Sequence, residues 1–188
     1  ATVQWLFTGY LLIIGIVFPL SGLLSNWFTT RQIILFVLIN FAVGAAISAS
    51  APGFCVLLLG RMIQGIATGL ILPLMFTVAM QIFPPYQLGA AMGMVGLVIM
   101  FAPAVGPTLA GAILGIASWR WIFWIFIPFL AIAFIFAVTS LKNIAPVTQP
   151  KIDFLSILLS MFGFGSLVVG VSLASSKGWE SPAVLGTL

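Results

Sequence analysis

Arg61 places a fixed positive charge inside an otherwise apolar run, "LLLGRMIQGIATGLILP", which covers residues 57–73. If a helix begins near Phe54, Arg61 lies about 10 Å along it, at 1.5 Å per residue. A charge near the middle of a membrane helix costs about 2.5–3.5 kcal/mol on insertion scales. Two interpretations follow: the guanidinium works inside the protein, or it snorkels back to the lipid headgroups.

Polar and small residues share one helical face with Arg61. The positions three, four, seven, eight and eleven residues later hold, in order, Gln64, Gly65, Thr68, Gly69 and Leu72. In an α-helix these positions form a single stripe. Such a stripe is expected to face other helices or a wet cavity rather than lipid. Thr68, Leu72 and Met75 could also line a substrate path, although ordinary packing explains residues of these types equally well.

Small residues recur four apart in the run at 88–117, within the stretch "FAPAVGPTLAGAILG". One ladder is formed by Ala102, Gly106 and Ala110, and another by Gly111 and Gly115. Such ladders let two helix backbones approach closely. Pro103 and Pro107 donate no backbone hydrogen bond, so this helix is expected to kink. A tightly packed helix pair in any membrane protein would give the same pattern.

Residues suited to enzyme chemistry are scarce. The chain has no His, and its two acids, Asp153 and Glu180, fall in loop segments. No carboxylate pair, metal-ligand cluster or nucleophile–base pair is therefore expected within a membrane. The six basic residues are dispersed singly, which does not favour nucleic-acid binding. We expect no enzyme activity, no cofactor and no metal site.

The composition indicates a lipid environment. Hydrophobic residues make up 63% of the 188 and charged residues 4%, whereas soluble domains carry about 25% charged residues. Six apolar runs are long enough to cross a bilayer, at 5–24, 32–50, 54–83, 88–117, 119–141 and 154–174. They do not alternate apolar and polar residues as barrel strands do, so we predict an all-α integral membrane fold.

The longest break between the runs, at 142–153, contains two prolines and two lysines and is typical of a polar linker. Lys and Arg residues in the loops indicate the orientation of the spans. One side holds Arg31, Lys142 and Lys151, and the other holds Arg120 and Lys177. This small excess favours a cytoplasmic location for the breaks at 25–32 and 142–153.

Two of these motifs resemble the major facilitator superfamily, most closely its drug:proton antiporters with fourteen helices. In that family the fourth helix carries Leu, three residues, Arg, two residues and Gln-Gly. Leu57, Arg61, Gln64 and Gly65 match this pattern in order. The fifth helix of the family carries an antiporter signature, a Gly-Pro pair among small residues. Gly106, Pro107 and Gly111 match it, with Ala102 and Ala110 where the family often has Gly.

A third motif of the family, between its second and third helices, is matched in part. Gly22, Leu24 and Arg31 fit the pattern, and Asn26 stands where the family usually has Asp. The stretch "WFTTRQ" is similar to a subgroup close to the lincomycin-resistance type of exporter. The resemblance implies that Gly22, Asn26 and Arg31 belong to a conformational-switch loop.

The resemblance also implies a partial superfamily bundle, from about helix two to the start of helix eight. A chain that opens inside an apolar run and lacks an initial Met is expected to be part of a longer protein. Residues 1–141 would be an N-terminal transporter half without its first helix, and 142–153 a cytoplasmic linker. Residues 154–188 would form the next helix and the start of another.

The function implied by the resemblance is proton-driven multidrug export across a bacterial cytoplasmic membrane, by alternating access around a site near the midplane. Arg61, Gln64 and Gly65 would take part in proton coupling. The partners would be protons, an amphipathic drug-like substrate, the lipid bilayer and the remainder of the transporter chain. Export of a siderophore, lipid or amino acid is an alternative, and a membrane-embedded enzyme or sensor is another.

Overall fold

The computed structural model describes residues 2–141, 143, 153–178 and 181–186, and the regular structure in these ranges is helical. The long helices are α1 (Thr2–Trp27), α2 (Thr30–Ala49), α3 (Phe54–Ile82), α4 (Leu88–Ile116), α6 (Phe126–Ser140) and α7 (Phe154–Lys177). The short ones are η1 (Pro85–Gln87), α5 (Trp121–Trp124) and α8 (Pro182–Leu185). Six segments of the described chain are long and apolar enough to cross a membrane, with α5 and α6 together forming one. The prediction of an all-α membrane fold is confirmed. The predicted linker lies outside the described residues except at 143 and 153.

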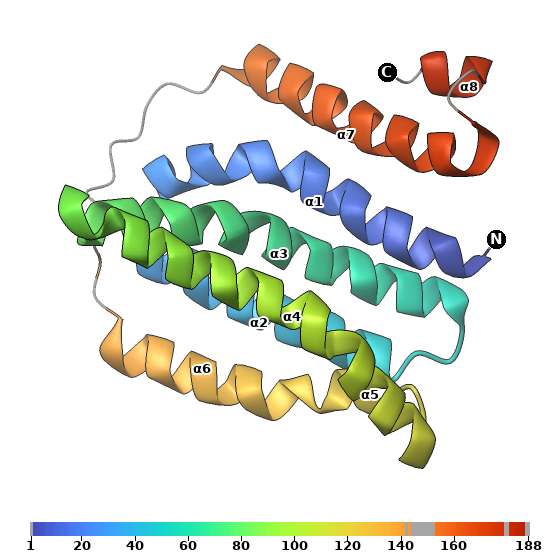
Figure 1. Cartoon of the computed structure of the whole chain (residues 1–188), viewed down its shortest axis with the longest axis horizontal. Helices are drawn as coiled ribbons and strands as arrows, with labels where there is room; N and C mark the ends of the chain where they lie inside the picture. Colours follow the sequence, from blue (N-terminus) through green and yellow to red (C-terminus); the bar gives the residue numbers. More distant parts are fainter. Residues whose placement is uncertain (1, 142, 144–152, 179–180, 187–188) are drawn as a thin grey trace.

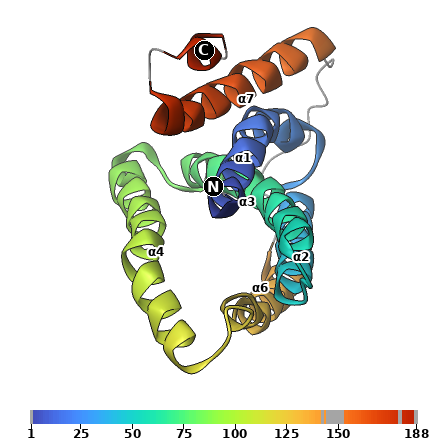
Figure 2. The same cartoon turned by 90° about the vertical axis from the view of Figure 1, so that its right-hand side faces the viewer.

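Helix α3 lies at the centre of the bundle, packed extensively against both α1 and α2 (Figure 1). Helix α7 covers the outer side of α1, and α6 lies against α2. Successive long helices run in alternating directions, so the α1–α2 and α3–α4 connections and the end of α6 share one end of the molecule. Helix α4 stands apart from α1 and α2 and contacts the rest through α3 and α5 (Figure 2).

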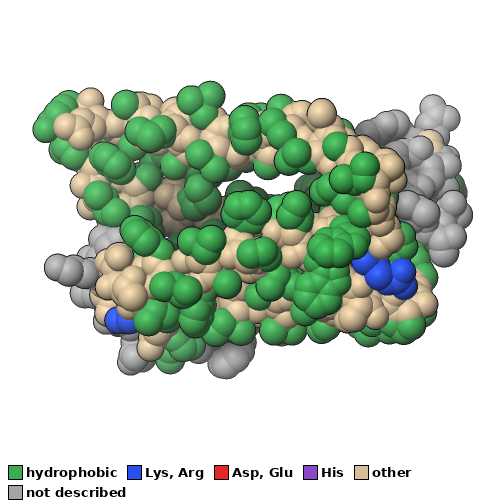
Figure 3. Space-filling model, turned by 90° about the horizontal axis from the view of Figure 1, so that it is seen from below, with side chains coloured by type: hydrophobic (Ala, Val, Ile, Leu, Met, Phe, Trp, Pro, Cys, Tyr) green, Lys and Arg blue, Asp and Glu red, His purple; other side chains and the backbone are tan. Residues whose placement is uncertain are grey.

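The surface agrees with a membrane location. Hydrophobic side chains are spread along the face shown in Figure 3, whereas Lys and Arg side chains appear only toward its two ends. Large apolar side chains such as Met100 on α4 and Phe129 on α6 are about two-thirds exposed. In a bilayer these side chains would contact lipid or further helices instead of water.

The connection between α1 and α2 is shorter than the sequence predicts. The break expected at 25–32 was placed wrongly, because only residues 28–29 separate the two helices. Ser25 remains helical, with its hydroxyl donating to the carbonyl four residues earlier at 2.8 Å. Thr29 and Gln32 form a capping box that starts α2 directly after this tight connection.

Proline residues act differently in two of the spans. The run predicted at 119–141 is divided at Ile125 into α5 and α6. Pro128 has no N–H to donate to the carbonyl of Trp124, four residues earlier, so regular hydrogen bonding is interrupted there. Helix α4 continues as one α-helix through both of its prolines and bows along its length (Figure 2).

Glycine faces glycine where α2 crosses α3. A Cβ added to Gly60 would lie 2.9 Å from the carbonyl oxygen of Gly44 and 2.9 Å from the amide nitrogen of Ser48. A Cβ added to Gly44 would lie 2.8 Å from the carbonyl oxygen of Gly60. These three atoms belong to the backbone, so neither site can accept a methyl group without moving a helix.

We therefore predict that Gly60→Ala destabilises the protein although alanine favours helices. Overpacking of this kind costs about 1–3 kcal/mol, more than the gain of up to about 1 kcal/mol from helix propensity. The measurement is the thermal unfolding temperature of the purified protein in detergent. Gly163→Ala on α7 is the control, because its added Cβ would meet no neighbouring atom within 4 Å. An unfolding temperature for Gly60→Ala equal to or above that of the control would contradict this crossing.

Candidate functional site

The face of α3 that carries Arg61 is packed against α1 and α2. A Cβ added to Gly65 would lie 3.0 Å from the carbonyl oxygen of Tyr10. A Cβ added to Gly69, one turn later, would lie 3.0 Å from Val17 Cβ. The small residues of the stripe therefore bring the α1 backbone close to α3, and the stripe faces other helices as its composition predicts.

Gln64 fills the seam between α3 and α2 and is only 2% exposed. A Cβ added to Gly44 would lie 2.7 Å from Gln64 Cγ, so the side chain rests directly against the α2 backbone. Its Oε1 accepts a long hydrogen bond from Arg61 Nη1 at 3.4 Å. A buried amide and a guanidinium thus meet on the same side of α3.

Thr68 joins this polar face to α1. Its hydroxyl donates to the carbonyl oxygen of Gln64 at 3.1 Å. The same hydroxyl oxygen lies 2.8 Å from the hydroxyl oxygen of Tyr10. Because the Thr68 proton is used by the carbonyl, the Tyr10 hydroxyl is the donor in this second contact.

Aromatic rings lie beside the Arg61 guanidinium. Its Cζ is 5.7 Å from the ring centroid of Tyr10 on α1 and 5.0 Å from that of Phe123 on α5. Both distances are within the range of cation–π attraction. The carboxylate of Asp153, the acid that the structure describes, is engaged by groups at the start of its own helix, α7.

Of the three residues expected to form a switch loop, two lie within α1 and one lies in the first turn of α2. Gly22 and Asn26 lie exposed within α1, and a Cβ added to Gly22 would meet no neighbouring atom within 4 Å. Arg31, in the first turn of α2, donates from Nη2 to the carbonyl oxygen of Val138 at 2.6 Å. A cation at this position complements the partial negative charge at the end of α6. Arg31 thereby ties the α1–α2 connection to α6.

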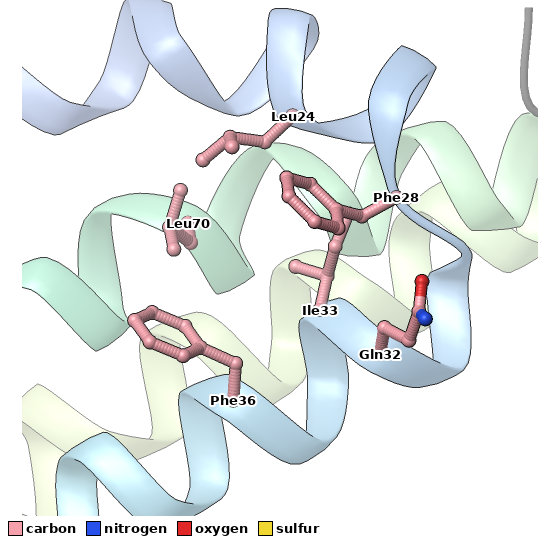
Figure 4. A pocket seen from close by; sticks show the side chains of 6 residues that line it. All are labelled: Leu24, Phe28, Gln32, Ile33, Phe36 and Leu70. Carbon is pink, nitrogen blue, oxygen red and sulfur yellow. The ribbon is translucent and has the colours of Figure 1, made fainter.

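A cavity of about 420 Å³ opens between α1, α2 and α3. Its lining side chains, shown in Figure 4, are Leu24, Phe28, Gln32, Ile33, Phe36 and Leu70. The wall is apolar apart from the amide of Gln32. The residues expected along a substrate path, Thr68, Leu72 and Met75, are half-buried on α3 and do not line this cavity.

The antiporter-signature residues lie on the open helix α4. Ala102, Pro107 and Gly111 are exposed, and Gly106 is half-exposed. A Cβ added to Gly106 or Gly111 would meet no neighbouring atom within 4 Å. These small residues therefore make no close helix contact within the part of the chain that the structure describes.

A family model described as Major Facilitator Superfamily matches residues 1–186. The chain belongs to the major facilitator superfamily. The human organic anion transporter MFSD10 (TETRAN) has a similar crystal structure, with a TM-score of 0.71 over 97% of this chain and 43% of that one. At 18% identity, this likeness shows the fold alone.

Two bacterial relatives of this superfamily chain carry resistance names. The chain is 54% identical over 190 residues to the lincomycin resistance protein LmrB of Bacillus subtilis (strain 168), covering 100% of this chain and 40% of the relative. It is 30% identical over 178 residues to the multidrug resistance protein B homolog of Mycobacterium tuberculosis (strain ATCC 25618 / H37Rv), covering 95% and 33%. The chain thus spans about two fifths or less of the length of these relatives.

Sequence reasoning missed the groups that surround the superfamily's Arg-Gln-Gly motif. Tyr10 and Phe123 were not singled out, because their contact with Arg61 joins positions far apart in the chain. The spacing of Gly44 and Ser48, four residues apart and opposite Gly60, is a signal that could have found the α2–α3 crossing.

Asp153 caps α7 outside its membrane-spanning part. Its carboxylate accepts hydrogen bonds from the Ser156 hydroxyl at 2.6 Å and from the backbone amides of Leu155 and Ser156 at 3.1 and 3.3 Å. The Ser156 hydroxyl contributes most to holding the pKa of this carboxyl below its usual value, and the two amides add to it.

A carboxyl with a lowered pKa stabilises the folded cap at neutral pH. The contribution is lost as the pH falls below about 4, the usual Asp value, and through the lower folded pKa. We predict that amide protection factors in the first turn of α7, measured by hydrogen–deuterium exchange, fall in this acid range. In Asp153→Asn the amide oxygen accepts at every pH, so protection should be weaker at neutral pH and nearly independent of pH. Identical acid profiles for the two proteins would refute the cap.

Proposed function

We propose that this chain is part of a proton-driven exporter of amphipathic, drug-like molecules in a bacterial cytoplasmic membrane. The observation that carries the proposal is the position of Arg61, a cation on a membrane-spanning helix that is packed into protein beside a buried Gln64. A snorkelling side chain would need none of these contacts. The resistance names of the bacterial relatives support a drug-like cargo.

Arg61 would act through the proton affinity of an acid. A nearby positive charge favours the ionised form of a carboxyl group, so approach of Arg61 would release a proton and withdrawal would allow one to bind. The acids of this sequence, Asp153 and Glu180, lie outside its apolar spans. The acid that responds to Arg61 would therefore belong to a helix of the remaining chain, most simply the helix that precedes α1.

The segments of the bundle would have separate roles in alternating access. We assign residues 1–141 to the N-terminal half, 142–153 to a cytoplasmic linker, and 154–188 to the helices that follow. The Arg31 contact with α6 would then hold the cytoplasmic end of the half together as it rocks. The small residues Ala102, Gly106 and Ala110, which form an open ladder on α4, would seal against a helix of the other half.

The direct test is Arg61→Ala in the complete polypeptide that carries this chain. Export should fall to roughly a tenth or less of the native rate, the equivalent of about 1.4 kcal/mol or more in the barrier. The measurement is lincomycin uptake into inverted membrane vesicles under an imposed pH gradient, at matched expression. Arg61→Lys should keep part of the activity, because the charge remains although the fork of donors is lost.

Native, proton-dependent export by Arg61→Ala would show that the side chain only snorkels. A chimera tests the assignment in a defined background: residues 1–188 replace the matching segment of the Bacillus subtilis lincomycin resistance protein. Retained lincomycin export by the chimera would support the drug-exporter reading. A folded chimera that exports another cargo but no lincomycin would reassign the substrate.

A second test concerns the open ladder on α4. Gly106→Leu in the complete polypeptide should abolish export, because a large side chain would prevent the close seal that we propose for this face. Gly93→Leu is the control, since a Cβ added to Gly93 would also meet no neighbouring atom within 4 Å and Gly93 lies on a different face of α4. Equal export by the two variants would show that Gly106 does not face a helix.

A further inference from the structure

The guanidinium of Arg61 lies within reach of two aromatic rings that come from different helices. Its Cζ is 5.7 Å from the Tyr10 centroid and 5.0 Å from the Phe123 centroid. Aromatic faces carry partial negative charge and attract cations at these distances, more strongly where water is excluded. The rings thus provide an electrostatic attraction to the cation that lipid chains cannot provide.

Each ring is held by a second contact that fixes its position. The Tyr10 hydroxyl is 2.8 Å from Thr68 Oγ1, which anchors the ring to the same face of α3 as Arg61. Phe123 is 7% exposed and packs edge-to-face with Trp119, at 6.3 Å between centroids and an interplanar angle of 89°. Rings fixed in this way need little further ordering to receive the guanidinium.

The segment that carries Phe123 is itself fastened to the bundle. Arg120 Nη2 donates to the carbonyl oxygen of Ala51 at 2.9 Å, beyond the end of α2. Its Cζ also lies 4.5 Å from the Trp119 ring centroid. Arg120 therefore attaches the start of α5 to the α2–α3 connection. This connection leads directly into α3, the helix that carries Arg61.

We infer that Tyr10 and Phe123 are positioning residues that clamp the Arg61 guanidinium between α1 and α5 through cation–π contacts. The inference rests on the proposed role of Arg61 in proton coupling and extends it to the groups that hold the cation in place. The clamp keeps the charge at a fixed depth in the membrane while Gln64 binds it from α3 itself. Movement of α1 or α5 relative to α3 then moves the cation toward or away from its acid.

The experiment replaces Phe123 in the complete polypeptide by phenylalanines with one, two or three ring fluorines. Fluorine withdraws charge from the ring face with little change of shape, so it weakens a cation–π contact stepwise. The unfolding temperature of the purified protein should fall stepwise, by roughly 1–3 °C over the series. In an Arg61→Met background the slope should be much smaller, because the cation is gone and only the edge-to-face contact with Trp119 still responds to fluorine. The same series at Phe129, an exposed ring on α6, is the control.

A flat series at Phe123 in the native background, or the same slope in the Arg61→Met background, would overturn the clamp. The thermal readout requires no transport, so it decides the clamp even if the native protein exports nothing. Transport then separates the two proposals. If native protein exports and Arg61→Ala does not, the pH profile of lincomycin export should shift along the fluorine series. If Arg61→Ala is inactive but the pH profile of export stays constant along the fluorine series, the proposed function stands. The clamp then has no part in proton coupling.

Discussion

A guanidinium cannot be left in hydrocarbon, and this constraint organises the bundle. Arg61 belongs to a helix with a membrane-spanning length and composition, so protein has to surround its charge. Helix α3 accordingly occupies the centre, with α1 and α2 on its sides and α5 over the guanidinium. The outward faces of the long helices, that of α3 included, present large apolar side chains to the surroundings.

Surrounding one helix on several sides requires its neighbours to come very close. Lipid chains are as apolar as leucine, so helices in a bilayer associate by dispersion and hydrogen bonds rather than by escape from water. Gly65 admits the α1 backbone, and Gly60 admits the α2 backbone. The first approach brings Tyr10 of α1 within reach of Arg61, and the second presses the α2 backbone against Gln64, which contacts Arg61 from α3 itself. The glycines are therefore as necessary to the polar site as the residues that contact the cation.

Features that depend on local spacing could be predicted from the sequence, and contacts between distant segments could not. Six apolar runs and the stripe containing Gln64 follow from composition and helical periodicity, and both are found in the structure. The extension of α1 to Trp27 could not be predicted, since Ser25 and Asn26 are residue types that favour caps and turns over helix interiors. The Arg31 contact with Val138 joins residues 107 positions apart, which no local pattern encodes. Family resemblance identified Arg61 and Gly106 as motif residues without showing which atoms lie around them.

Two of the packed seams, α1–α3 and α1–α7, share a construction that α4 lacks within the described chain. Between α1 and α3, Gly65 is accompanied by the hydrogen bond from Tyr10 to Thr68.

Between α1 and α7, a Cβ on Gly165 would lie 3.3 Å from Ile16, and Thr8 Oγ1 lies 2.9 Å from the hydroxyl oxygen of Ser172. Each of these seams thus combines a glycine that permits close approach with a polar pair that fixes register. Helix α4 has the glycines but meets no partner backbone there. Because glycine in a helix costs about 1 kcal/mol relative to alanine, a ladder of glycines without a neighbour would only destabilise α4. This cost is the physical argument behind the proposal that the ladder packs against a further helix.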